Sequence, residues 1–140
     1  WDNKEYSLPF VGEEGCWDHP NVKKYKELAD SADAFVLSSP EYHGTMSGVM
    51  KNSLDWLSFD QTSGKVFAFI STLGGQPNTT TLNHMRTVVR WIHGFSIPEQ
   101  LVIAKVKTAF DDDGNLVDED IKKRVDKFID SIITNTEKLR

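Results

Sequence analysis

Two short runs of the chain are apolar at every position, which is typical of strands that helices cover on both faces. They are Ala34–Leu37 and Val66–Ile70, and the second lies within a predicted strand over Lys65–Ser71. A third predicted strand, Leu101–Val106, alternates more towards its end, as strands at the edge of a sheet do. The sequence therefore predicts three strands, with the first two buried side by side.

Four further segments repeat apolar residues at the spacing of amphipathic helices. They are Asn21–Asp30, a segment from about Ser47 to Trp56, a segment capped by Asn78 or Thr79 that ends near Ile92, and Asp118–Arg140. Composition indicates loops over Gly12–Pro20 and Gln61–Gly64. Strands that alternate with helices in this way predict an α/β fold built on an open parallel sheet.

Polar loops follow the first two predicted strands. In the first loop, Ser38–Gly44, we expect Pro40 to end the strand and Gly44 to permit a tight turn, with an acid, a phenol and an imidazole between them. The second loop is Thr72–Gln76. Ligands of open α/β sheets bind at the carboxyl ends of the strands, so both loops are expected to converge on one crevice.

The residue types of these loops suit a planar, hydrogen-bonding ring such as a flavin better than a phosphate. Gly74 and Gly75 let the backbone approach a ligand closely and present its amides, which suits the pyrimidine edge of a flavin. Two plainer interpretations remain open. The first loop is also compatible with a solvated turn, and the second with an ordinary turn between a strand and a helix.

Five motifs along the chain resemble the NAD(P)H-dependent FMN reductase family, and the azobenzene reductase branch within it. They are Ser39–Gly44, Gly48–Trp56, Ser71–Gly75, Leu82–Arg86 and Ile97–Gln100. The resemblance implies a flavodoxin-like, three-layer α/β sandwich with a parallel sheet of strand order 2-1-3-4-5, of which strands 3, 4 and 5 are visible here. It also implies that residues 1–140 form a single domain that lacks the N-terminal strand–helix–strand unit. The first strand of that unit would be central in the full sheet and would pair with strand 3.

The family pattern implies an oxidoreductase in which NADPH or NADH passes a hydride to FMN, and the flavin passes electrons to a quinone, an azo compound or a similar small acceptor. Because the flavin carries that chemistry, no side chain is assigned a catalytic role. The residues implied to bind FMN border its ring or complete its pocket. They are Ser39, Pro40, Glu41, Tyr42, His43, Thr72, Gly74 and Gly75.

Two other classes of function remain open. One is a flavodoxin-like electron carrier that accepts electrons from a protein, and the other is a non-catalytic scaffold without a phosphate-binding turn.

The resemblance also implies a homodimer or homotetramer, with Met46, Trp56 and Phe59 as candidates for the subunit contact. Arg86 and Arg90 lie one turn apart and could meet NADPH, a partner subunit or groups of the same chain.

Composition and residue spacing exclude several other classes of protein and site. The chain has 140 residues, 39% of them hydrophobic, which is enough for one core, and its net charge of -5 argues against a nucleic-acid surface. No apolar run is long enough for a membrane helix, and the single Cys16 fits a reducing cytoplasm. No metal is expected, because Asp111–Gly114 lacks the first ligand of a calcium loop and the four histidines lack the spacing of a zinc site.

Overall fold

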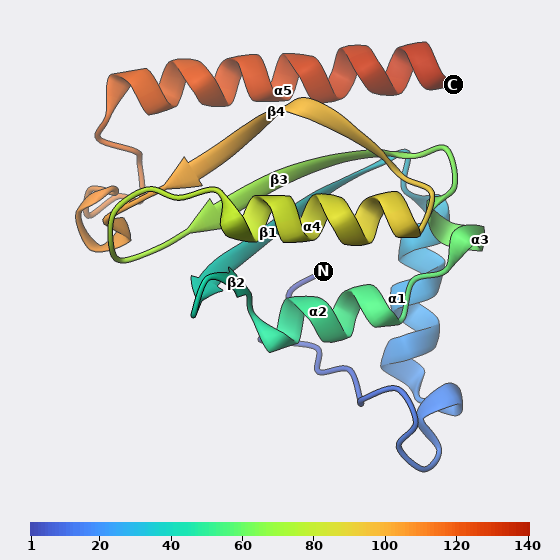
Figure 1. Ribbon diagram of the computed structural model, residues 1–140. Coiled ribbons are helices and arrows are strands. Elements are labelled where there is room, and N and C mark those ends of the chain that lie inside the picture. The colour runs from blue at the N-terminus through green and yellow to red at the C-terminus, as the bar shows by residue number, and fades with distance from the viewer.

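A computed structural model describes all 140 residues and shows one four-stranded sheet with helices on both faces (Figure 1). The strands are β1 (Ala34–Tyr42), β2 (Thr45–Met46), β3 (Val66–Thr72) and β4 (Phe95–Ile103). Their order across the sheet is β2-β1-β3-β4, with β1, β3 and β4 parallel and β2 antiparallel to β1. The α/β class and the parallel sheet are confirmed, and the third predicted strand, β4, lies at an edge as expected.

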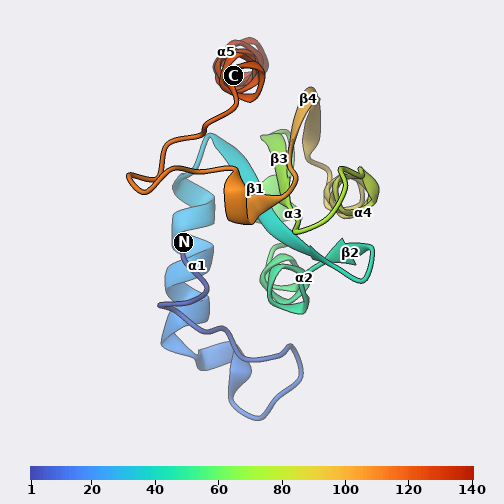
Figure 2. The same cartoon turned by 90° about the vertical axis from the view of Figure 1, so that its left-hand side faces the viewer.

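Five α-helices surround the sheet. They are α1 (Pro20–Ser31), α2 (Gly48–Asp55), α3 (Phe59–Thr62), α4 (Thr80–Trp91) and α5 (Glu119–Leu139), with short 3-10 helices η1 (Cys16–Asp18) and η2 (Val106–Thr108). Helix α5 crosses one face of the sheet, whereas α4 and α2 lie on the other (Figure 1). Helix α1 stands beyond β1, to the left in the turned view (Figure 2).

The two faces of β3 form two separate cores. Phe67 and Phe69 point to the α4 side and pack with Leu82, Met85 and Val89 in the larger cluster. Val66 and Ala68, which alternate with these two residues along the strand, point the other way, where Phe128 of α5 covers them. Because both faces are fully covered, β3 has the continuous apolar sequence of a buried parallel strand.

Three predicted boundaries are wrong. Pro40 does not end β1, which continues to Tyr42, because a proline is tolerated in a strand that has an open edge. Gln61 and Thr62 lie in α3 rather than in a loop, because Ser58 and Gln61 form a capping box.

The third error concerns β4, which begins at Phe95 and ends at Ile103 rather than spanning Leu101–Val106. Gly94 and Pro98 read as breaks in the sequence. The strand accommodates Pro98 in an irregularity, since the β3 residues Phe67 and Phe69 pair with Ser96 and Gln100. The positions between them supply the extra residues of this bulge.

One long edge of β1 is open. Seven residues of β1, Ala34 to Pro40, pair with β3 on one side, and β2 pairs only with Glu41 and Tyr42 on the other. In a parallel ladder every second residue turns its backbone groups away from a given neighbour. Within these 140 residues no strand meets the groups that β1 presents at this edge, which is where the family resemblance expects a further strand.

Candidate functional site

A two-residue turn joins β1 to β2 and forms one side of the predicted crevice. Tyr42 pairs with Thr45, and the residues between them both have positive φ, 51° at His43 and 80° at Gly44. Two successive left-handed residues define a type I′ turn, whose twist suits a hairpin. The turn holds Tyr42 and His43 at the surface, and the Tyr42 side chain is 62% exposed.

The loop after β3 forms the other side. Pro40 and Thr72 are partners in the β1–β3 ladder, so the two loops start next to each other at the carboxyl edge of the sheet. The Leu73 amide donates to the Ile103 carbonyl at 3.0 Å, and the Lys105 amide donates to the Gly75 carbonyl at 3.3 Å. These bonds fix the first half of the loop to the end of β4.

The amides of this loop are available to a ligand. The N–H groups of Gly74, Gly75 and Gln76 donate to no acceptor in the chain. A Cβ atom on Gly74 or Gly75 would meet nothing within 4 Å, so the space beside this backbone is open. Consecutive exposed donors of this kind suit a carbonyl-rich or negatively charged ring edge.

Glu41 joins the two sides of the crevice. Its Oε1 accepts a hydrogen bond from Asn78 Nδ2, and its Oε2 accepts one from Thr81 Oγ1 at 3.0 Å. A second contact lies beside it, since His84 Nδ1 and Thr45 Oγ1 are 2.8 Å apart. Helix α4 and the residues before it are therefore tied to both strands of the hairpin.

Ser39 lies beneath the crevice rather than in it. Its side chain is buried, and its hydroxyl donates to the Pro40 carbonyl at 2.9 Å while accepting from the Ser47 amide at 3.0 Å. Ser47 in turn caps α2 by accepting from the Met50 amide at 3.1 Å. Ser39 thus fixes the start of α2 behind the hairpin. Its ladder partner Ser71 is fully buried, and the Ser71 hydroxyl has no partner.

The fold thus brings all eight predicted site residues to one edge of the sheet, in three roles. Tyr42, His43, Gly74 and Gly75 are accessible, Pro40 and Thr72 are half-buried partners in the ladder, and Ser39 and Glu41 bond to neighbouring elements. Whether these residues bind a cofactor stays a prediction. The sequence reasoning missed Thr81, Thr45 and His84. Asn78 was predicted only as a helix cap, and its Oδ1 does accept from the Thr80 amide at 2.9 Å.

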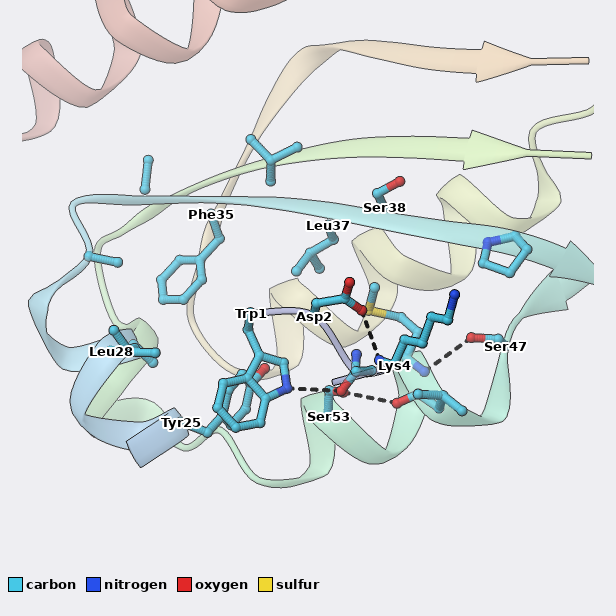
Figure 3. Close-up of a pocket in the computed structure, with 18 of the residues that line it drawn as sticks. Trp1, Asp2, Lys4, Tyr25, Leu28, Phe35, Leu37, Ser38, Ser47 and Ser53 are labelled. Atoms are coloured by element: carbon cyan, nitrogen blue, oxygen red, sulfur yellow. Dashed lines mark hydrogen bonds between the residues drawn. The ribbon is translucent and has the colours of Figure 1, made fainter. Parts of the chain in front are cut away.

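A cavity of about 810 Å³ lies along the open edge of β1 (Figure 3), and two of the predicted site residues, Pro40 and Tyr42, are among the residues that line it. Tyr25 and Leu28 of α1 line one side, Phe35 and Leu37 of β1 line another, and the segment that begins at Trp1 crosses it. Burial raises the pKa of Tyr25 to about 12, because the ionised phenol would lose its hydration there. The lining is mainly apolar.

Arg86 belongs to the scaffold. Its Nε donates to Gln100 Oε1 at 3.0 Å, its Nη2 donates to the Pro98 carbonyl at 3.2 Å, and its guanidinium lies 4.9 Å from the ring centre of Phe69. Burial lowers the pKa of this guanidinium. Arg86 thus holds the irregular part of β4 against α4, which is the intramolecular alternative left open by the sequence.

Two of the residues expected at a subunit contact are unavailable. Met46 is 7% exposed and Trp56 is 2% exposed, because they pack inside the chain, and only Phe59 lies at the surface.

Cys16 is also buried, in a cluster with Val22 and Trp56. The structure contains no group of three metal-ligating side chains. No helix is both long and apolar enough to cross a membrane.

Comparison with known proteins gives a consistent result. Residues 2–108 match the family model described as NADPH-dependent FMN reductase. The FMN-dependent NADPH-azoreductase of Staphylococcus aureus strain USA300 is 35% identical over 116 residues, which cover 81% of this chain and 62% of that protein. The chain therefore spans less than two thirds of the length of this curated relative.

Two solved structures share the fold. The flavoenzyme NAD(P)H:(acceptor) oxidoreductase FerB from Paracoccus denitrificans superposes with a TM-score of 0.78 and 24% identity, covering 94% of this chain and 76% of that one. An oxidoreductase from Corynebacterium diphtheriae gives a TM-score of 0.71 and 15% identity, covering 86% of this chain and 64% of that one. These similarities confirm the flavodoxin-like α/β fold.

Proposed function

The chain belongs to the NADPH-dependent FMN reductase family, and on that basis we propose that it binds FMN and serves as an NAD(P)H-dependent oxidoreductase of the azoreductase and quinone reductase type. The family resemblance of the five sequence motifs is thereby confirmed, whereas activity, cofactor and substrates are the proposal. The single observation that carries it is the pair of loops at the carboxyl edge of β1 and β3, with an exposed aromatic ring on one and unpaired amides on the other.

The residues present fit the ring of FMN. Tyr42 offers a flat apolar surface, as a planar ring requires, and it is exposed rather than packed. The amides of Gly74, Gly75 and Gln76 donate to nothing else, and they suit the O2 and N1 atoms of the pyrimidine edge, which need donors. We assign no residue of this chain to the phosphate of FMN.

Bound FMN would supply hydride and electron transfer between NADPH or NADH and a quinone, an azo compound or a similar small acceptor. The chain's own residues would orient the ring and exclude water from one of its edges. Fixed amides at the pyrimidine edge would stabilise negative charge there without reorganising, which favours the reduced form. No side-chain acid or base is required for this contribution.

The proposal is tested by the visible spectrum of the full-length protein after FMN is added, the excess is removed and NADPH is added without oxygen. A retained yellow colour that bleaches fully is the expected result. Retained FMN that does not bleach with NADPH, but forms a stable semiquinone with another reductant, would instead identify an electron carrier. A protein that retains no FMN would favour a non-catalytic scaffold.

Assembly and location are part of the same proposal. A homodimer or homotetramer is supported by the family resemblance and by exposed aromatic side chains such as Phe59, which stacks on His93 at a ring distance of 4.2 Å. A cytoplasmic location is supported by the presence of only one cysteine. Sedimentation velocity of the full-length protein measures the first, and fractionation of cells measures the second.

A further inference from the structure

Both oxygens of the Glu41 carboxylate are used within the chain. Oε1 accepts from Asn78 Nδ2 and Oε2 accepts from Thr81 Oγ1. We propose that Glu41 is a positioning residue, which holds the hairpin of Tyr42 at a fixed distance from the loop of Gly74 and Gly75 and does not itself contact FMN. This inference rests on the proposed function and gives Glu41 a different role from the one implied by the family resemblance.

Asn78 connects Glu41 to the start of α4. Its Nδ2 donates to the carboxylate, while its Oδ1 accepts from the Thr80 amide at 2.9 Å. The N-cap residue Thr79 makes no side-chain hydrogen bond, so Asn78 and the adjacent negative charge stabilise this end of the helix instead. Glu41 is therefore bonded to the backbone of α4 through a single side chain.

Thr81 makes the connection costly to break. Its side chain is completely buried, and its hydroxyl forms one hydrogen bond, to Glu41. A buried hydroxyl that loses its only partner is strongly disfavoured, so Thr81 holds the carboxylate in place. The contact between His84 and Thr45 adds a second tie between α4 and the hairpin.

The loop between β3 and α4 depends on this connection. Its first half is bonded to the end of β4 through Leu73 and Gly75, and its second half is bonded only through Asn78. Between the two anchors lies the unpaired amide of Gln76, whereas the unpaired amides of Gly74 and Gly75 lie beside the first anchor. Without the bond to Glu41 the segment from Gln76 to Asn78 is no longer tied to the hairpin, and the Gln76 amide loses the fixed direction relative to Tyr42 on which binding depends.

The test compares three variants of the full-length protein with a matched control. Glu41→Gln keeps the shape of the side chain but removes its negative charge and one of its two acceptor oxygens, and Asn78→Ala removes the exposed partner. The double variant Glu41→Gln/Asn78→Ala measures their coupling. The control, Gln100→Ala, removes the bond from Arg86 Nε, which ties the same helix to β4 away from the crevice.

Three quantities are measured: the dissociation constant of FMN by fluorescence quenching, the absorption spectrum of bound FMN, and the melting temperature without FMN. Each single variant is expected to weaken FMN binding about tenfold, with the same spectral shift, and the double variant is expected to bind no more weakly than the weaker single one. Gln100→Ala is expected to lower the melting temperature and leave FMN affinity unchanged.

Two results would overturn the inference alone. One is weaker binding by Glu41→Gln with wild-type binding by Asn78→Ala, which indicates direct contact between Glu41 and FMN. The other is a loss of affinity that follows the melting temperature equally in all variants, Gln100→Ala included. Failure of the wild-type protein to bind FMN would instead overturn the proposed function, and this inference with it.

Discussion

Gly94 lies against the ring of Phe67, and a Cβ atom on Gly94 would come within 2.5 Å of two ring carbons and 2.8 Å of Val89 Cγ1. Phe67 and Val89 are both completely buried, so neither side chain has room to move. Gly94 is thus required for lack of space and not for its backbone conformation, since its φ lies outside the left-handed region.

We therefore expect Gly94→Ala to lower the free energy of unfolding by about 1–3 kcal/mol, the usual cost of overpacking a core. Urea denaturation measures this change. Gly48→Ala is the control, since nothing lies near Gly48 and it opens α2, where alanine is at least as favourable. A Gly94→Ala protein as stable as the wild type would show that the β3–α4 core is looser than the structure indicates.

Gly44 is required for its backbone conformation and not for lack of space. Nothing lies within 4 Å of a Cβ atom there, but its φ is 80°. We expect Gly44→Ala to cost about 1 kcal/mol through backbone strain alone. His43→Asn, at a φ of 51°, should leave stability nearly unchanged because asparagine tolerates this conformation. Thermal unfolding of both variants measures these effects, and equal losses would argue against a type I′ turn.

Tyr42 should affect binding without affecting stability. Its side chain is 62% exposed, so Tyr42→Ala is expected to change the free energy of unfolding by less than about 0.5 kcal/mol. Loss of the aromatic surface should weaken FMN binding about five- to tenfold, whereas Tyr42→Phe should bind almost normally. Titration of the full-length proteins with FMN measures both affinities. Equal affinities for all three proteins would remove Tyr42 from the ring site.

Tyr25 should make the protein sensitive to alkali. Burial raises its pKa in the folded state to about 12, so between about pH 10 and 12 the unfolded chain loses this proton while the folded chain retains it. Stability should therefore fall as the pH rises through this range. Tyr25→Phe removes this contribution. The midpoint of urea unfolding should thus fall less between pH 8 and 11 in the variant, and equal losses would contradict the shift.

The open edge of β1 should cause self-association of a protein prepared as these 140 residues. Val36 lies on that strand and is 50% exposed, so a flat apolar edge is available for pairing. Val36→Lys is expected to reduce the oligomeric fraction several-fold in sedimentation velocity, because charged side chains block edge pairing. Val117→Lys, at a position 53% exposed outside the sheet, should have little effect. Association that persists equally in both variants would locate the contact elsewhere.

Much of the fold could be predicted from local patterns in the sequence. The apolar run of β3 and the periodic residues of α4 and α5 led to correct elements because each of those segments buries a continuous face. The errors at Pro40 and Pro98 share a cause. A proline breaks a strand only where its N–H would have bonded, and sequence does not show that β1 has an open edge or that β4 contains a bulge.

The candidate site was predictable to a similar degree. Pro40 and Thr72 were expected at one edge of the sheet, and the ladder pairs them. The role of Thr81 was not foreseeable, because a buried threonine inside a helix looks like any other core position until its partner is known. Ser39 likewise resembled a loop residue, although Ser47 uses its hydroxyl eight positions later in the chain.

The region that matches the family is shorter than the unit that folds, because helix α5 lies beyond that region and still covers part of the core. The family match ends at residue 108, yet Phe128 of α5 covers Val66, Ala68 and Ile97 on one face of the sheet. A protein trimmed to the matched region would retain every candidate site residue while exposing the smaller core on that face of the sheet to water. Expression boundaries chosen from similarity alone would therefore yield an insoluble product, and an inactive preparation of that kind would say nothing about the chemistry of the crevice.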